Sequence, residues 1–191
     1  MLKISHLCKR FENKLIFDDF SYTFNNGLYL IHGSSGVGKT TLLRLIAGLD
    51  TDFSGEISGG GLGEVSVSFQ EYRLFPTLTG IENVLLVYDN PTDEDADEAK
   101  DLLITLGLTE ADVNLFPHEM SGGMKLRISL ARAILKKTPI LLLDEPTREL
   151  NLELIQKVAK LLEEEAKDRI VIIVTHDDID SLFVSKTVIN L

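Results

Sequence analysis

The residues with the clearest capacity for chemistry form the run Gly33-Ser34-Ser35-Gly36-Val37-Gly38-Lys39-Thr40. Its glycines allow backbone N–H groups to turn inward, and a ring of such groups binds phosphate oxygens. Lys39 adds a positive charge that reaches the terminal phosphates, and the Thr40 hydroxyl is a ligand for Mg²⁺. The run predicts a nucleotide-phosphate site from Gly33 to Thr41, with the next helix contributing the positive end of its dipole.

A second chemical feature is the pair of acids Asp144 and Glu145, which follow the apolar run 140–143. A strand of a parallel sheet delivers such residues to its carboxyl edge, where ligands of α/β proteins bind. There Asp144 suits the Mg²⁺ side of the site. Glu145 is then placed to polarise an attacking water as a general base. Alone the pair is a weak signal, and together with the phosphate loop it predicts phosphoryl chemistry.

The elements that position these residues alternate between strand and helix. Apolar runs and alternating patterns predict strands at 2–7, 20–24, 28–32, 65–69, 140–143, 170–174 and 187–191. Helical spacing predicts helices at 39–47, 81–88, 96–106, 121–135, 152–166 and 178–183. The acidic run 93–101 is interpreted as a solvated helix face. This order predicts an α/β fold with a mixed, mostly parallel sheet, an N-terminal antiparallel β part and an inserted helical subdomain. We expect one domain over 1–191, with an α/β core at 1–75 and 138–191 and the helical subdomain at 76–137.

Composition excludes several classes of protein. The formal net charge is −11, from 19 Lys and Arg against 30 Asp and Glu, which argues against a nucleic-acid partner. No apolar run approaches the roughly 20 residues that span a bilayer, and residues 1–10 lack the apolar core of a secretory signal. Cys8 is the single cysteine, so an internal disulfide is excluded and a reduced cytoplasmic setting is expected.

With these motifs in place, the segment Met120-Ser121-Gly122-Gly123-Met124-Lys125-Leu126-Arg127 resembles the signature motif of the ABC ATPase family, which are P-loop NTPases. The resemblance covers nearly the whole chain. It implies that Ser121, Gly122 and Gly123, at the start of a helix, complete the ATP γ-phosphate pocket of a second subunit.

Three further positions match the family in the expected order. Gln70 corresponds to the family's Q-loop residue, which senses Mg²⁺ and the membrane partner. His176 corresponds to the switch histidine that contacts the γ-phosphate. Phe11 corresponds to the aromatic residue that stacks on adenine, although a core position is the alternative interpretation. The resemblance therefore implies that Glu145, His176 and Lys39 are catalytic and that Thr40, Gln70 and Asp144 hold the metal.

The chain departs from the family pattern after the two acids, in the segment 148–151. The family usually has two small residues, Leu and Asp there, whereas this chain has Arg148, Glu149, Leu150 and Asn151. Asn151 keeps the shape of the usual Asp but loses its charge, which bears on the coupling between subunits. Met124 and Leu126 stand where Gln is common, and the interval between the phosphate loop and Gln70 is short.

The resemblance implies an ATP-binding and ATP-hydrolysing subunit with ATP and Mg²⁺ as cofactors. It would form a dimer with an identical subunit or a close paralogue and would power membrane-spanning transporter subunits from the inner face of the cell membrane. The segment 116–124 is most similar to bacterial importers of small anions or nutrients, with exporters as the alternative. Two other functions stay open: an ABC ATPase of a soluble machine, and a regulatory module that binds ATP without turnover.

Overall fold

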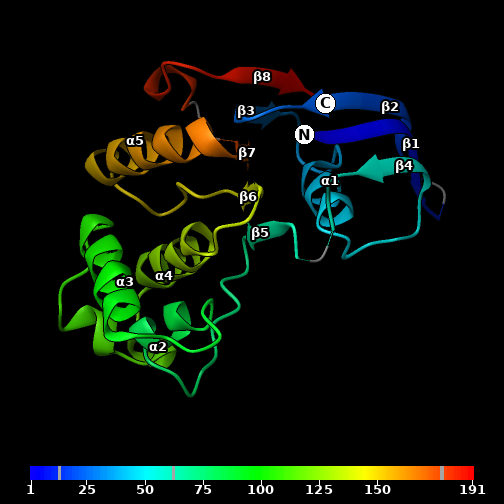
Figure 1. Cartoon of the computed structure of the whole chain (residues 1–191). Helices are drawn as coiled ribbons and strands as arrows, with labels where there is room; N and C mark the ends of the chain where they lie inside the picture. The colour runs from blue at the N-terminus through cyan, green and yellow to red at the C-terminus, as the bar shows by residue number, and fades with distance from the viewer. Residues whose placement is uncertain (13, 62, 177–178) are drawn as a thin grey trace.

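The computed structural model describes residues 1–12, 14–61, 63–176 and 179–191, and their strands form two sheets (Figure 1). The antiparallel sheet has the order β2-β1-β4, and the parallel sheet has the order β5-β6-β7-β3-β8. The strands are β1 (Leu2–Phe11), β2 (Lys14–Phe24), β3 (Gly27–His32), β4 (Ser54–Ser58), β5 (Val65–Ser68), β6 (Ile140–Asp144), β7 (Ile170–Val174) and β8 (Thr187–Asn190). The α/β fold with a mostly parallel sheet is therefore confirmed.

The centre of the parallel sheet consists of β6 and β7, in which every residue is buried. Such continuous apolar strands are typical of a parallel sheet covered on both faces. Alternate side chains divide the core: Leu141 and Leu143 belong to the cluster with α4 and α5, while Leu142 belongs to the cluster with α1. Both clusters fix the register of β6, so the acid at its end emerges at the carboxyl edge of the sheet.

The antiparallel sheet is more extensive than the sequence pattern predicts. The pairing of β1 with β2 shifts register between Ile4 and Leu7, and His6 and Asp19 have positive φ angles of 52° and 57°. These irregularities break the alternation on which the prediction depends. The sequence pattern also misses β4, because only Ile57 of this edge strand is even partly buried.

The helices cover both sides of the parallel sheet. They are α1 (Lys39–Ile46), α2 (Gly80–Leu85), α3 (Asp93–Thr105), α4 (Gly122–Leu135) and α5 (Leu152–Asp168), with 3₁₀ turns at Asp112–Asn114, Pro117–Glu119 and Asp180–Leu182. In Figure 1, α2, α3 and α4 gather below the sheets, while α1 lies beside the antiparallel sheet. None of the helices in the described ranges has the length and apolar character needed to cross a membrane.

Side-chain caps explain where the helices of the lower group begin. Thr79 and Thr92 each accept a hydrogen bond from the backbone N–H three residues later, and the acid at that position bonds back. Ser121 accepts a hydrogen bond from the N–H of Met124 and begins α4. The acidic run that was interpreted as a helix face includes the first turn of α3. Carboxylates there interact favourably with the positive end of the helix dipole.

The prediction of a helix at 178–183 is wrong for the residues in this range that the structure describes. Residue 178 lies outside the described residues, and from residue 179 onward only the 3₁₀ turn Asp180–Leu182 forms. Two tertiary contacts explain this difference. Asp180 pairs with His32 at 2.8 Å, and Phe183 is buried in the core, so the local helical pattern does not decide the conformation.

Candidate nucleotide site

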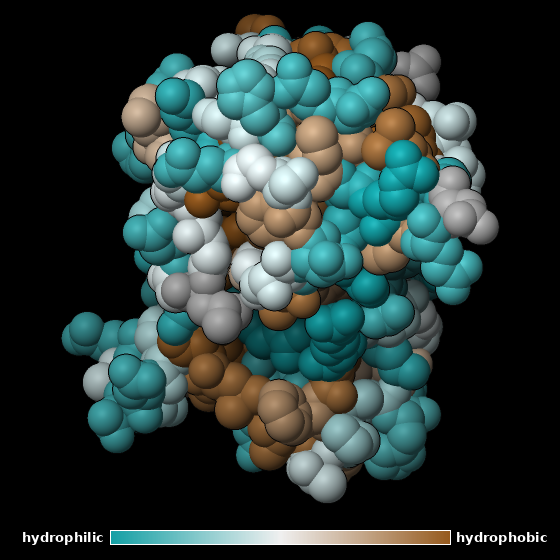
Figure 2. All heavy atoms as spheres, turned by 90° about the vertical axis from the view of Figure 1, so that its right-hand side faces the viewer, coloured by the Kyte–Doolittle hydropathy of each residue, from teal (hydrophilic) through white to brown (hydrophobic). Residues whose placement is uncertain are grey.

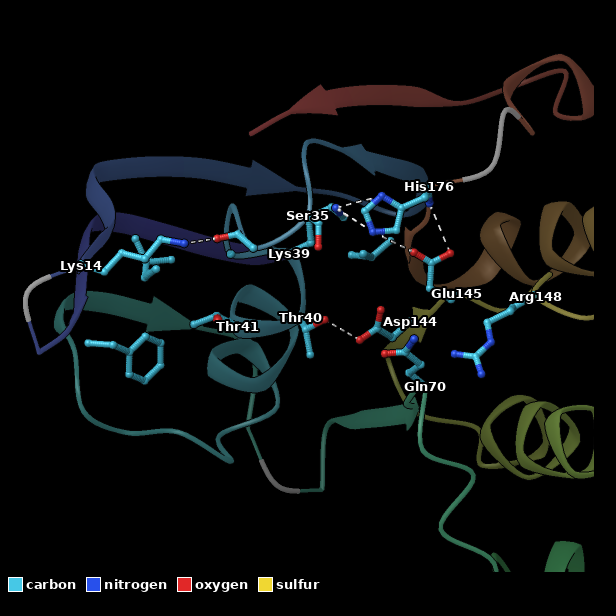
Figure 3. Close-up of a pocket in the computed structure, with 15 residues that line it drawn as sticks. Lys14, Ser35, Lys39, Thr40, Thr41, Gln70, Asp144, Glu145, Arg148 and His176 are labelled. Carbon is cyan, nitrogen blue, oxygen red and sulfur yellow. Dashed lines mark hydrogen bonds and ion pairs between the residues drawn. The ribbon is translucent and has the colours of Figure 1, made fainter. Parts of the chain in front are cut away.

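Four loops meet at the carboxyl edge of the parallel sheet, after β3, β5, β6 and β7. They border a cavity of about 590 Å³ that the antiparallel sheet and the N-terminus of α1 also line (Figure 3). Of the residues predicted for the site, the structure brings together around this cavity Phe11, Ser35, Gly36, Gly38, Lys39, Thr40, Thr41, Gln70, Asp144, Glu145 and His176. Of the same prediction, Gly33, Ser34 and Val37 belong to the loop without lining the cavity.

The glycine-rich loop has a backbone that a larger residue could not adopt at Gly38. This residue has φ = 118°, and an added Cβ would overlap the side chain of Ile16 and press on Phe17. It leads directly into α1, whose first residue, Lys39, is only 6% exposed. The Lys39 ammonium donates hydrogen bonds to the carbonyl oxygens of Gly33 at 2.7 Å and Ser34 at 3.2 Å. The charge is thus held inside the loop that would receive phosphate oxygens.

The metal-ligand candidates Thr40 and Asp144 lie against each other. The Thr40 hydroxyl donates a 2.7 Å hydrogen bond to a carboxylate oxygen of Asp144. Burial raises the pKa of Asp144, and this hydrogen bond and the Lys39 charge offset only part of that effect. A nearby cation would relieve the desolvated carboxylate.

Mg²⁺ suits this set of oxygen donors. It is usually held by one or two carboxylates together with water and substrate phosphates. Thr40 and Asp144 supply such oxygens, and the amide of Gln70 lines the same cavity. No cluster of three or more His, Cys, Asp or Glu side chains that could hold a metal occurs among the described residues. Phosphate oxygens would supply further ligands to a cation held here.

Glu145 is held at the end of β6 by the neighbouring strand end. Its carboxylate accepts hydrogen bonds of 3.2 Å from the Thr175 hydroxyl and from the backbone N–H of His176. The His176 ring lies 3.5 Å from the other carboxylate oxygen and 3.4 Å from the Lys39 ammonium. Figure 3 shows Glu145, His176 and Lys39 converging on one end of the cavity. Glu145 also has φ = 55°, in the left-handed region that non-glycine residues rarely adopt.

Phe11 also lines the cavity and is 47% exposed, so it is not a core residue. The buried Lys9 ammonium lies 4.6 Å from the centre of its ring, a cation–π contact. Lys9 is itself held by hydrogen bonds to Asp50 and Asp52, in the loop after α1. The Lys9 ammonium therefore lies over the Phe11 ring and is fixed in place by the two aspartates.

Ser121, Gly122 and Gly123 do not line this cavity. They form the N-terminal end of α4, where the Ser121 side chain already caps the helix. The structure therefore separates the predicted site residues into two groups within one chain, the cavity residues and the α4 end.

Sequence reasoning missed two charged residues that line the cavity. Lys14, on β2, donates a 2.8 Å hydrogen bond to the carbonyl oxygen of Gly36 (Figure 3). Arg148, noted only as a departure from the family pattern, also lines the cavity next to Glu145. No sequence pattern indicates that the Lys14 side chain on β2 bonds to the glycine-rich loop. For Arg148 the signal was its place three residues after Glu145.

A glycine-rich loop between β3 and α1, with two acids at the end of the nearby strand β6, defines a P-loop nucleotide-binding protein of the α/β class. A sequence profile of the family described as "ABC transporter" matches residues 17–148. The chain belongs to this family.

Curated relatives are import ATP-binding proteins. The chain is 34% identical to the spermidine/putrescine import ATP-binding protein PotA of Bacteroides thetaiotaomicron, over 99% of the chain and 44% of that protein. It is 36% identical to the Fe(3+) ions import ATP-binding protein FbpC of Brucella abortus, over 96% of the chain and 56% of that protein. The chain thus spans about half the length of the curated relatives it matches.

Solved structures agree with this assignment. A dimeric ATP-binding cassette in a post-hydrolysis state with ADP and Pi has a TM-score of 0.85 and 26% sequence identity. The match covers 100% of this chain and 94% of that one. A second dimeric structure, of a bacterial ABC transporter cassette, has a TM-score of 0.86 and 27% identity.

Proposed function

We propose that the chain is the ATP-binding and ATP-hydrolysing subunit of an ABC transporter that works with separate membrane-spanning subunits. The observation that carries this proposal is the arrangement of Glu145. Its carboxylate is fixed by two hydrogen bonds at the end of the cavity where Lys39 and His176 also point. A fixed carboxylate beside two groups that can contact a terminal phosphate is what hydrolysis requires.

In this proposal each residue has a defined task. The loop from Gly33 to Thr41 binds the phosphates, Phe11 stacks on adenine, and Lys39 balances the charge of the γ-phosphate. Mg²⁺, held by Thr40, Asp144 and Gln70, would neutralise charge on the β- and γ-phosphates.

Hydrolysis proceeds by in-line attack of a water on the γ-phosphorus. As the water oxygen bonds to phosphorus, its proton passes to Glu145 and the bond to the bridging oxygen breaks, releasing ADP and phosphate. His176 donates a hydrogen bond to the transferred phosphate. The backbone N–H of His176 and the Thr175 hydroxyl keep Glu145 oriented during the transfer.

A second subunit completes the site. The end of α4 with Ser121, Gly122 and Gly123 lies outside the cavity, which supports a contact of these residues with the ATP of another subunit. The two similar solved cassettes are dimers, which supports a head-to-tail pair of identical or closely related subunits. ATP closes the pair and hydrolysis reopens it.

The partner in the membrane would dock on the helical part of the chain. Figure 2 shows apolar atoms gathered on the lower part of the molecule. The exposed apolar side chains of this part include Phe75, Leu86 and Phe116. Buried Asn83 shapes the segment after Gln70 by bonding the backbone of Phe75 at both its N–H and its C=O. Docking at this surface would place the chain at the inner face of the cell membrane. The net charge of −11 supports the absence of a nucleic-acid partner.

The proposal is tested by the subunit's association state in ATP. The Glu145→Gln variant should bind ATP without turnover and should elute as a dimer in ATP and as a monomer without it. Lys39→Ala in the same background is the matched control and should stay monomeric. A Glu145→Gln protein that binds ATP and stays monomeric at high subunit concentration would favour the regulatory binding module.

A further inference from the structure

The segment between β6 and α5 carries a carboxylate, Glu149, at a position where the family usually has a small residue. Glu149 has φ = 65°, in the left-handed region that non-glycine residues rarely adopt. Such a conformation persists only where surrounding contacts hold it. The contacts of this side chain therefore indicate what the residue does.

Glu149 is tied to the segment after Gln70 and to its own neighbour. The Tyr72 hydroxyl donates hydrogen bonds to its carboxylate at 3.2 Å and 3.4 Å. The Arg148 guanidinium donates to the same group at 3.2 Å. Burial and the nearby Glu149 charge raise the pKa of Tyr72, so this hydroxyl stays a neutral donor.

The Glu149 carboxylate lies at the N-terminal end of α4. A methyl group added to Gly122, the first residue of that helix, would overlap a carboxylate oxygen of Glu149. Because the Cα–Cβ direction in a helix tilts toward the N-terminus, this oxygen lies beside the helix end. In the described part of the chain, neither the Gly122 nor the Gly123 N–H donates a hydrogen bond. The positive end of the helix dipole is thus faced by an anion of the same chain.

We propose that Glu149 is a competing anion at the Ser121–Gly123 end of α4 and sets the ATP concentration at which the dimer forms. This inference rests on the proposed function, in which that helix end receives the γ-phosphate of the second subunit's ATP. Two anions at one helix end repel each other, so the phosphate must displace Glu149. Arg148, already bonded to the carboxylate and lining the cavity, is the group with which the displaced side chain can stay paired.

The charge of Glu149 and its hydrogen bonds to the Tyr72 hydroxyl can be removed separately, and we expect the two variants to behave differently. Glu149→Gln removes the charge and keeps an oxygen that accepts from Tyr72. Tyr72→Phe removes the tie and keeps the charge. Glu153→Gln is the matched control, because Glu153 is an exposed acid in the first turn of α5 that pairs with Lys157.

The experiment measures dimer fraction by sizing against ATP concentration, with all variants in the Glu145→Gln background. Glu149→Gln should lower the ATP concentration for half-maximal dimer about threefold to tenfold, since each dimer has two such helix ends. Glu153→Gln should stay within about twofold of the background protein. Tyr72→Phe, which loosens Glu149 and keeps its charge, should shift the curve less than Glu149→Gln does. Added salt should narrow the difference that Glu149→Gln makes, because screening weakens the repulsion.

Each other outcome has a defined meaning. If the background protein dimerises in ATP and Glu149→Gln leaves the curve unchanged, the inference is overturned. It is also overturned if Tyr72→Phe shifts the curve as far as Glu149→Gln, because the tie would then matter and the charge would not. If the background protein itself fails to dimerise, the proposed function is contradicted, and this inference with it.

Discussion

The hydroxyl of Thr40 donates a 2.7 Å hydrogen bond to the carboxylate of Asp144, which joins the first turn of α1 to the end of β6. The two residues come from motifs more than a hundred positions apart in the sequence. Their contact makes the phosphate loop and the acid-bearing strand parts of one site. It also leaves a desolvated carboxylate where a cation is proposed to bind.

Replacing Asp144 by Asn should stabilise the nucleotide-free protein at neutral pH. Burial raises the pKa of Asp144 above its unfolded value, so the fold favours the protonated form. The associated stability is present in acid and is lost as the pH rises through the folded pKa. Asn stays neutral, and the free energy of unfolding at neutral pH should rise by about 1 kcal/mol.

Thermal unfolding at neutral and mildly acidic pH measures this effect. The gain from Asp144→Asn should shrink as the pH falls, and the variant should lose the stabilisation that Mg²⁺ adds in the presence of ATP. A variant that is less stable than the wild type at neutral pH would contradict the assignment of a desolvated, buried carboxylate.

Lys39→Ala should weaken ATP binding about a hundredfold, because its ammonium is held inside the loop that is proposed to bind the phosphates. Lys14→Ala should change the affinity less than about threefold, since Lys14 is exposed and its ammonium bonds the Gly36 carbonyl oxygen. Calorimetric titration of both variants measures the difference. Equal losses for both lysines would mean that the two share the phosphate contact.

Phe11→Ala should weaken ATP binding about tenfold or more and leave the binding of inorganic tripolyphosphate unchanged. The reason is that this half-exposed ring in the cavity is proposed to stack on the base, which tripolyphosphate lacks. Competition titrations with the two ligands give the ratio. A parallel loss for both would show that Phe11 supports the loop instead of the base.

Lys9→Met should weaken ATP binding relative to tripolyphosphate binding, as Phe11→Ala does, and it should also lower the free energy of unfolding. It removes the charge 4.6 Å from the Phe11 ring and leaves Asp50 without its buried partner. We expect the free energy of unfolding to fall by about 2 kcal/mol. Asp52→Asn is the control, because Asp52 is almost fully exposed and should change stability little.

The sequence was sufficient for elements with strong local signals. The central strands β6 and β7 and the helix after Gly38 follow from continuous apolar runs and from the loop chemistry. The edge strand β4 and the full length of β1 could not be predicted, because their residues are exposed or interrupted by positive φ angles. The support of Phe11 by Lys9 and the place of Glu149 at α4 depend on tertiary pairings that no local pattern records.

His176→Ala should reduce turnover about a hundredfold and leave the fold intact. The ring side chain is 53% exposed, so its loss should change the free energy of unfolding by less than about 0.5 kcal/mol. The backbone N–H that orients Glu145 remains in the variant, so the loss reports the ring alone. Phosphate release and thermal unfolding measure the two effects. A large loss of stability would indicate a structural role instead.

The most direct test of ATP hydrolysis at this site is the rate of phosphate release in saturating Mg²⁺ and ATP, for the wild type and for Glu145→Gln. We predict turnover by the wild type and a rate at least about a hundredfold lower for Glu145→Gln, with ATP still bound. Equal rates in the two proteins, or ATP binding without release by a dimeric wild type, would contradict the role of Glu145 as the base.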